Sequence, residues 1–381
     1  MKVIELGKRG SLALLHFVKR NPVMCIAFLA ALITSFIVPV DREYLDYFDL
    51  KTLTCLFCVL AVVCALKNID FFYILARRIV MLFGNARLCV LALVYITFIG
   101  SMLIANDMAL LTFLPLGFFV LSATQKLQYM AFTFIMQNIA ANLGGMLTPF
   151  GNPQNLYIYS AFNIPTGEFM SIMALPFAIS IAVITACCLI FVKKEALEIR
   201  EEETKIPRVR ALVYLVLFAL SIVIVFRVIP YQIGLVIVPV VLFFMDRDAL
   251  KKVDYPLLLT FCAFFVFAGN MARIPLVRAM FEILLEKNTL IFSALSCQFI
   301  SNVPSAVLLS QFTENYRELL LGVNIGGAGT LIASLASLIT FREYTRHNPK
   351  GTKKYIAVFS AFNFGMLGLL LAVESIVLGL A

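Results

Sequence analysis

The residues that could do chemistry in this chain are a few amides, hydroxyls and one carboxylate inside otherwise apolar segments. Asn106 and Asp107 interrupt the segment "SMLIANDMALL", and Asn302 interrupts the segment "SCQFISNVPSAVLL". Inside a membrane a carboxylate such as Asp107 costs at least ~2.5 kcal/mol and persists only with a partner or a function. It could ligate Na⁺ with Asn106 and the Gly151 carbonyl, carry a proton, or cap the helix that follows it.

A second candidate feature is a pair of matched helix breaks. The segment "ANLGGMLTPFGNPQNL" corresponds to "VNIGGAGTLIASLASL", and its core "GGMLTPFGNP" makes a continuous helix unlikely to form. Unwound backbone at membrane depth needs protein or a polar cavity to satisfy its N–H and C=O groups. A Pro-kinked helix packed through small residues is the alternative, but it does not explain the clustered Asn side chains. The residues expected to shape the two breaks are Asn142, Gly144, Gly145, Thr148, Pro149, Pro153, Asn324, Gly326 and Gly327.

Composition fixes the class of protein that these features belong to. Of 381 residues, 62% are hydrophobic and only 14% are charged, with a mean hydropathy of +0.96. This excludes soluble and disordered chains and predicts an all-α polytopic membrane protein. Most cysteines lie in apolar segments, and both histidines lie in basic stretches, so we expect no disulfide, no cofactor and no metal ion beyond a possible Na⁺. An enzyme is disfavoured because no nucleophile, base or metal constellation is evident.

The distribution of charge predicts the orientation. If the two interrupted segments are re-entrant hairpins, the remaining apolar segments cross the membrane an odd number of times. With the N-terminus inside, 24 of the 31 Lys and Arg residues then lie on the cytoplasmic side. We therefore expect a plasma-membrane protein with a cytoplasmic N-terminus and an external C-terminus. The net charge of +9 follows from this topology, and no nucleic-acid partner is expected.

The second half of the chain repeats the pattern of the first. We predict an interfacial N-terminus (1–21), a first repeat (22–192), a cytoplasmic linker (193–210), a connecting helix (211–229) and a second repeat (230–381). Each repeat would contain a re-entrant hairpin (86–123 and 288–313) with a short second arm, and a broken helix (129–160 and 319–341). An odd number of crossings between the copies inverts the second one, as in secondary transporters whose binding site lies at the bilayer midplane.

At these motifs the chain resembles the ion transporter superfamily, which includes arsenite, citrate and sodium-coupled divalent-anion permeases. The hairpin "ANDMALL" is similar to the arsenite branch, and "TPFGNPQN" to the divalent-anion and citrate branches. The resemblance covers essentially the whole chain. It implies that hairpin tips and helix breaks jointly hold substrate and coupling cations, in homodimers that move by an elevator mechanism.

The resemblance also implies a set of site residues. The Ser-Asn-Thr tips of the family correspond to 105–107 and 301–303, where only the Asn is kept in both. Asp107 and Val303 depart from the pattern and disfavour ordinary dicarboxylate recognition. Substrate contacts are expected from Asn106, Asp107, Asn152, Ser301, Asn302 and Ser334. Cation contacts are expected from Ser101, Asn106, Asp107, Gly151, Asn302 and Ala333, with Cys297 at the position that matches Ser101.

The sequence thus favours an ion-coupled secondary transporter of a small anion, either a carboxylate or an inorganic oxyanion, with Na⁺ or H⁺ as coupling ion. Two alternatives stay open: a cation/proton antiporter that uses Asp107, and an arsenite efflux permease. A small anionic substrate and membrane lipid are the expected partners, together with a second copy of the chain.

Overall fold

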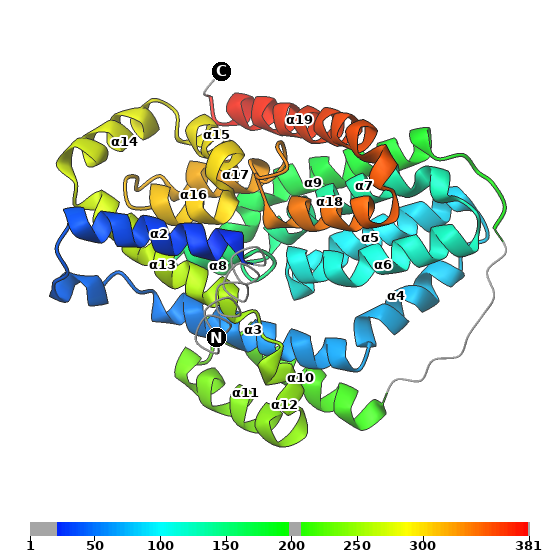
Figure 1. Cartoon of the computed structure of the whole chain (residues 1–381), viewed down its shortest axis with the longest axis horizontal. Coiled ribbons are helices and arrows are strands. Elements are labelled where there is room, and N and C mark those ends of the chain that lie inside the picture. Colours follow the sequence, from blue (N-terminus) through cyan, green and yellow to red (C-terminus); the bar gives the residue numbers. More distant parts are fainter. Residues whose placement is uncertain (1–20, 198–206, 380–381) are drawn as a thin grey trace, which may run out of the picture.

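A computed structural model describes residues 21–197 and 207–379. Within these ranges the secondary structure is helical, apart from one isolated β-bridge between Asn85 and Ala196 (Figure 1). The predicted interfacial N-terminus, 1–21, lies almost entirely outside the described residues, as does the middle of the predicted linker. The all-α class predicted from the sequence is confirmed for the part of the chain that is described.

The helices of the described residues fall into two halves joined by a connecting helix. The first half contains α2 (Pro22–Ile37), α3 (Leu50–Asn68), α4 (Phe71–Met81), α5 (Ala86–Ile104), α6 (Asn106–Ala123), α7 (Met130–Gly144), α8 (Pro153–Ala161) and α9 (Thr166–Phe191). A connecting helix, α10 (Arg208–Val225), follows. The second half contains α11 (Tyr231–Met245), α12 (Arg247–Lys251), α13 (Tyr255–Ala272), α14 (Pro275–Lys287), α15 (Thr289–Ile300), α16 (Asn302–Leu309), α17 (Tyr316–Ile325), α18 (Leu335–His347) and α19 (Thr352–Val377).

Matched N-caps start corresponding helices in the two halves. Asp49 caps α3 and Asp254 caps α13, each by accepting a backbone N–H three residues ahead, at 2.9 and 3.0 Å. Asn85 and Asn288 cap the first arms of the two hairpins in the same way. An N-cap satisfies one of the free N–H groups of the first helical turn. Local sequence signals therefore set equivalent helix starts in both halves.

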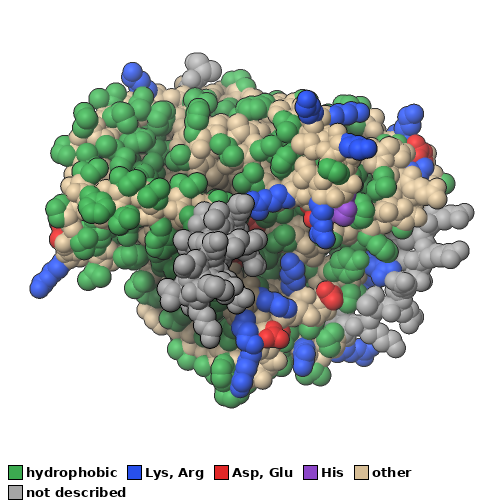
Figure 2. Space-filling view, in the orientation of Figure 1, with side chains coloured by type: hydrophobic (Ala, Val, Ile, Leu, Met, Phe, Trp, Pro, Cys, Tyr) green, Lys and Arg blue, Asp and Glu red, His purple; other side chains and the backbone are tan. Residues whose placement is uncertain are grey.

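The helices and the surface are those of an integral membrane protein. Among the described residues, seven helical stretches are long and apolar enough to cross a membrane. On the face shown in Figure 2, hydrophobic side chains cover most of the half over α2, α13 and α14, whereas Lys and Arg gather over the opposite half and the lower end. Residues such as Ile26, Leu29 and Phe36 of α2 are more than half exposed. An apolar surface of this extent is compatible with lipid contact, not with water.

The first hairpin differs from the sequence prediction in one respect. Its second arm was expected to be short, but α6 runs for 18 residues, close to the 19 of α5. The helix continues through Pro115, which is exposed, while its neighbours Leu114 and Leu116 are buried. The second hairpin has the expected short arms, of 12 and 8 residues.

Each broken helix packs across to the other half of the chain. The helix that follows the first break, α8, contacts α16 and α17 of the second half, and the helix that follows the second break, α18, contacts α6 and α7 of the first. Each hairpin also packs against the helix that precedes its own break, α5 against α7 and α15 against α17. The two tips and the two breaks are thereby brought into one central region.

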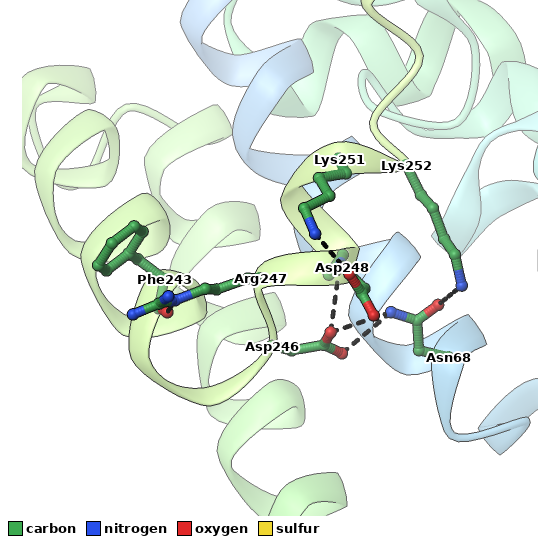
Figure 3. Close-up of polar contacts among 8 residues, drawn as sticks. Asn68, Phe243, Asp246, Arg247, Asp248, Lys251 and Lys252 are labelled. Atoms are coloured by element: carbon green, nitrogen blue, oxygen red, sulfur yellow. Dashed lines mark hydrogen bonds and ion pairs between the residues drawn. The ribbon is translucent and has the colours of Figure 1, made fainter.

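A polar clamp joins helices on the side where α3 ends (Figure 3). The carboxylate of Asp246 accepts both Asn68 Nδ2–H groups at 3.0 and 3.1 Å and the Tyr214 hydroxyl at 3.3 Å. Lys252 Nζ donates to Asn68 Oδ1 at 2.7 Å. This clamp fixes α3, α10 and the short helix α12 to one another, away from the hairpins.

A second clamp holds the start of the linker. Glu195 forms an ion pair with Lys126 and accepts a hydrogen bond from the Tyr129 hydroxyl. The bonds from Lys126 and Tyr129 hold the pKa of the Glu195 carboxyl below its ordinary value of 4.5. The Glu195 carbonyl also accepts the Ala86 N–H at 2.8 Å, so the linker begins against the base of the first hairpin.

Candidate functional site

The two hairpin tips share one unusual backbone conformation. Ala105 turns the chain between α5 and α6 with φ 65° and ψ 151°, and Ser301 turns it between α15 and α16 with φ 74° and ψ 159°. A residue other than glycine held in this region costs roughly 1–3 kcal/mol. Such strain persists where the surrounding structure fixes it, and it clusters at binding sites. The matched tips are the first geometric sign of a functional site.

Each tip is bonded to the helix break of its own half. The Asn106 N–H donates to the Gly151 carbonyl at 3.1 Å, and the Asn302 N–H donates to the Ala333 carbonyl at 2.9 Å. Each Asn side chain also accepts the next backbone N–H through its Oδ1 atom, at 2.9 Å in both tips. The positions aligned by sequence alone therefore make the same contacts in space.

A second pair of equivalent bonds ties the first arm of each hairpin to the break. The Thr148 hydroxyl donates to the Met102 carbonyl at 2.8 Å, and the Thr330 hydroxyl donates to the Gln298 carbonyl at 3.1 Å. Both threonines lie in unwound backbone, where a hydroxyl can reach across to the last turn of the neighbouring helix. Tip and break thus form one unit in each half.

Oxygen atoms crowd the first break so closely that only glycine fits. A methyl group at Gly145 would lie 2.4 Å from Asn152 Oδ1 and 2.9 Å from the Gly151 carbonyl oxygen. At Gly144 it would lie 2.4 Å from the Phe98 carbonyl oxygen. The glycines are therefore needed for close approach, which explains the Gly-Gly pair at this break.

Two hydroxyls and one unpaired amide oxygen complete this oxygen cluster. A methyl group added at Gly144 would lie 2.8 Å from Ser101 Oγ, and one added at Gly151 would lie 2.8 Å from Thr148 Oγ1. Asn152 is 1% exposed, and its Oδ1 atom accepts no hydrogen bond. A buried acceptor without a donor costs about 1–3 kcal/mol. Hydroxyl, amide and carbonyl oxygens are the ligands that hard cations prefer, so the cluster can hold a cation such as Na⁺.

A chain of buried amides joins the two halves. Asn106 Nδ2 donates to Asn142 Oδ1 at 3.2 Å, and Asn152 Nδ2 donates to the Asn142 carbonyl at 3.1 Å. Asn152 Nδ2 also lies 3.4 Å from Asn324 Oδ1, and Asn324 Nδ2 donates to Asn155 Oδ1 at 2.6 Å. Asn142 and Asn324, which precede the two Gly-Gly pairs, are therefore linked through the side chains of Asn152 and Asn155.

Asn155 was aligned with Ser337 in the sequence but was not chosen as a site residue. Its Nδ2 atom faces the carbonyls of Gly145, Met146 and Thr148 at 3.2 to 3.4 Å. One amide thus satisfies most of the unwound backbone at this break. No signal in the sequence indicated this role, because it depends on carbonyls that come together only in the folded chain.

The second break is built from smaller groups. Ser334 caps α18: its Oγ accepts the Ser337 N–H at 3.2 Å and lies 3.1 Å from Ser337 Oγ. Ser301 Oγ donates to the Ala333 carbonyl at 3.3 Å. The Cys297 thiol donates to the Ser293 carbonyl at 3.2 Å. Ser334, Ser301 and Ala333 therefore lie together, but no counterpart of the Asn152 amide is present among them.

Asp107 lines a small cavity beside the first tip and the first break. The cavity, of about 20 Å³, is also lined by Met108 and Phe150, apolar residues of α3 and the α13 cap Asp254. None of the other predicted cation ligands lines this cavity, and Asp107 Oδ1 accepts no hydrogen bond. A cavity of this size holds about one water molecule. Of the predicted cation ligands, Asn106 and Gly151 are bonded to each other, and Asp107 lines the adjoining cavity.

Four helix N-termini lie at the tips and breaks. α6 and α16 begin at the tips, and α8 and α18 begin just after the breaks, where Pro153 occupies the first position of α8. Helix N-termini carry partial positive charge and free N–H groups, which favour anions. The sequence places no Lys or Arg in the tips or breaks, 105–107, 148–153, 301–303 and 326–334. An anion bound here would be held by backbone and amide dipoles.

Comparison with known proteins shows one family and two relatives. A family model described as citrate transporter matches residues 12–316. The uncharacterized transporter MJ0456 of Methanocaldococcus jannaschii is 32% identical over 308 residues, which cover 79% of this chain and 82% of that protein. The inner membrane protein YbiR of Escherichia coli is 29% identical over 321 residues, which cover 81% of this chain and 84% of that protein. The resemblance read from the hairpin and break motifs is confirmed by the family match.

Proposed function

The chain belongs to the citrate transporter family, a membrane transporter family of the anion-permease type, and we propose that it is an ion-coupled secondary transporter of a small anion. The proposed substrate is a carboxylate or an inorganic oxyanion, and the proposed coupling ion is Na⁺ or H⁺. The site is the central region in which the two tips and the two breaks meet.

One observation carries the anion proposal. Two strained tips, at Ala105 and Ser301, are each bonded to a break in the same way, so four helix N-termini start in one region. This arrangement supports recognition of negative charge by backbone dipoles. A neutral substrate would gain little from it.

The oxygen cluster at the first break supports a coupling cation. It contains the unpaired Asn152 Oδ1, the Gly151 carbonyl and the Ser101 hydroxyl, without a formal negative charge. The Gly151 carbonyl also accepts the Asn106 N–H of the tip. A cation bound here would stabilise the tip in the conformation that receives the anion, which is a physical basis for coupling.

Transport by this site requires alternating access. We propose an elevator motion in a plasma-membrane homodimer, with the N-terminus cytoplasmic and the C-terminus outside. The Asp246 clamp among α3, α10 and α12 and the separate packing of the hairpins against α7 and α17 support a division into a fixed and a moving part.

A cation/proton antiporter is the second candidate. Its support is the unpaired Asp107 Oδ1, which faces a cavity shared with Asp254 and not with the oxygen cluster. In that case Asp107 would be the exchanged carboxylate and no anion would move. Arsenite efflux remains a third candidate on the likeness of the "ANDMALL" tip.

The test is a current recorded from proteoliposomes on a solid-supported membrane. Citrate, succinate, sulfate, phosphate and arsenite are applied in Na⁺ and in K⁺ at two pH values, to wild type and to Asp107→Asn. A current triggered by an anion and dependent on the cation supports the symporter. Current from Na⁺ or pH steps alone, silent with every anion and lost in Asp107→Asn, overturns it in favour of antiport.

A further inference from the structure

The helices of this chain pack as two groups. In one, α3 packs against α10, α11, α12 and α13, and α13 packs against α2. In the other, the two hairpins, the helices on both sides of each break, α9 and α19 pack on one another. After the proposed elevator motion, we call these the fixed group (α2, α3 and α10–α13) and the moving group (α5–α9 and α15–α19). The short helices α4 and α14 touch both groups, and α3 and α13 otherwise make the main contacts, against α5, α8 and α16.

The ring contacts between the two groups can slide. Tyr157 of α8 packs against Phe265 of α13 with ring centroids 5.6 Å apart. Phe150 of the first break meets the edge of Phe226, at the end of α10, at 5.7 Å. Apolar contacts are non-directional, so they hold two surfaces together without fixing one position of one against the other. A directional contact is needed to select a single position.

One side chain supplies that directional contact. Arg227, just after α10, donates from Nη1 to the Ile164 carbonyl at 3.2 Å and from Nη2 to the Tyr159 carbonyl. Its guanidinium carbon lies 4.0 Å from the centre of the Tyr159 ring. Within residues 21–197 and 207–379, the hydrogen bonds that join the fixed group to the moving group all come from Arg227.

The backbone at Arg227 takes a shape that an arginine does not favour. α8 and α10 end alike: the two N–H groups after the last turn bond carbonyls three and five residues back, at 2.9 to 3.2 Å. This helix ending places one residue in the left-handed region, where glycine is usual and asparagine is tolerated. Asn163 holds that position after α8 with φ 51°, and Arg227 holds it after α10 with φ 64°. The turn alone does not explain an arginine there, so the side chain has a use.

The guanidinium is held by groups that can also be solvated. Its acceptors are carbonyls at the C-terminal end of α8, where a helix carries partial negative charge. No carboxylate in the described part of the chain pairs with it, and its Nε atom is buried without an acceptor. The contact can therefore open without breaking a buried ion pair, which would be costly.

The bonded helix leads directly to the site. α8 is nine residues long and begins immediately after Asn152, at the first break. A contact that holds its C-terminal end also holds its N-terminal end, because a short helix moves as one body. Arg227 touches neither the tips nor the oxygen cluster, so it acts on the site through α8.

We propose that Arg227 is a latch between the two groups: it ties α8, and with it the first break, to the fixed group in the conformation described, and it opens each time the moving group crosses the membrane. The inference rests on the proposed function and adds the contact that the motion has to break.

The experiment measures the distance between the two groups by pulsed electron paramagnetic resonance. p-Acetylphenylalanine replaces Asp248 of the fixed group and Lys354 of the moving group, which are both exposed. Ketone-reactive nitroxides then leave the nine native cysteines unlabelled. Full-length protein, co-expressed with an excess of unlabelled chain, is measured in lipid nanodiscs with and without Na⁺. We expect the distance of the described conformation in wild type, and its absence would overturn the inference.

Three variants test the latch itself. Arg227→Gln should move the equilibrium away from the described conformation by roughly 10- to 150-fold, the effect of losing a hydrogen bond to a charged group. Arg227→Lys keeps the charge but loses the fork of two donors, so the shift should have the same direction and be smaller. Arg273→Gln is the matched control, because Arg273 bonds Asp41 and Tyr47 inside the fixed group, and its distances should equal those of wild type.

An unchanged distance distribution in Arg227→Gln would overturn the latch, and so would an equal shift in Arg273→Gln. A lower unfolding temperature of Arg227→Gln with an unchanged distribution would assign the arginine to stability and also overturn it. If Arg227→Gln does not fold, Arg227→Lys carries the same test.

The outcome for the latch is separable from that for transport, because the distances are measured without any anion. The anion-triggered current is recorded on the same proteins. A shifted distribution in Arg227→Gln with no anion current in wild type refutes the anion proposal and retains the latch. An anion current in wild type with a distribution that Arg227→Gln leaves unchanged refutes the latch and leaves the proposed transport standing.

Discussion

Replacing Gly145 by alanine places a methyl group where the first break has room only for hydrogen. The added Cβ would lie 2.4 Å from Asn152 Oδ1 and 2.9 Å from the Gly151 carbonyl oxygen. Both oxygens must move outward, and both belong to the proposed cation cluster. Overpacking of an interior costs about 1–3 kcal/mol. If the cost falls on the cation-bound state, binding weakens by about 5- to 150-fold, since each 1.4 kcal/mol is tenfold.

The assay is the Na⁺ concentration that gives half of the maximal anion-triggered current. Gly145→Ala should shift this concentration upward by the factor above, with a smaller effect on the anion concentration needed at saturating Na⁺. Gly365→Ala in α19 is the matched control, because no atom lies within 4 Å of its added methyl group. Alanine should stabilise that helix by roughly 0.5–1 kcal/mol and leave the Na⁺ dependence unchanged.

The reasoning about the first break would be refuted by a Gly145→Ala protein with wild-type Na⁺ dependence. It would also be refuted if Gly145→Ala and Gly365→Ala shifted the Na⁺ dependence equally. A lower thermal stability of Gly145→Ala in choline alone, with unchanged Na⁺ dependence, would assign the glycine to packing and remove it from the cation site.

Three further predictions concern the elements around the site. Glu195→Gln should lower the thermal unfolding temperature at pH 7. Because pairing with Lys126 lowers the pKa of Glu195 in the folded state, the ionised carboxylate stabilises the fold above about pH 4.5, and this stabilisation is lost as the pH falls through the folded-state pKa. The difference in unfolding temperature between the variant and wild type should therefore shrink near pH 4. Arg273→Gln breaks ion pairs with Asp41 and Glu43 that lie at the surface, and should change the thermal unfolding temperature little and the Na⁺ dependence not at all; a large drop in the unfolding temperature would contradict this. Asn155→Ala removes an amide NH₂ group, whose two hydrogens can bond two of the three facing carbonyls at a time. The loss of two buried hydrogen bonds, at 1–3 kcal/mol each, should cost about 2–6 kcal/mol of stability. An unfolding temperature equal to that of wild type would show that the break does not depend on this amide.

The sequence predicted the elements whose signals are local. The breaks were visible because Gly144, Gly145 and Pro149 disfavour a continuous helix inside an apolar span, and the tips because Asn106 and Asn302 interrupt apolar arms. The structure puts the breaks at these glycines and the turns directly before these asparagines. The order of spans, interfacial helices and hairpins follows from the same local patterns. The inverted orientation of the two halves stays a prediction.

Features that depend on side-chain direction were not readable. Asp107 follows the tip Asn directly, yet successive helical residues point about 100° apart, and Asp107 lines a cavity that residues of α3 and α13 share. Asn155 was missed because its function depends on which carbonyls come within 3.4 Å after the chain folds. The 18-residue length of α6 was missed because α6 continues through Pro115, and a proline in a helix interior usually disrupts the helix.

The most direct test of the central claim is an anion-triggered, cation-dependent current in which each tip is removed in turn. Currents are recorded with the most active anion of the panel, in Na⁺ and in K⁺ at two pH values, for wild type, Asn106→Ala and Asn302→Ala, with Gly365→Ala as the control. The account predicts a current in wild type and in the control that depends on the coupling cation and is lost in both tip variants. A current that survives the loss of either tip Asn, or one that needs no anion, would contradict it.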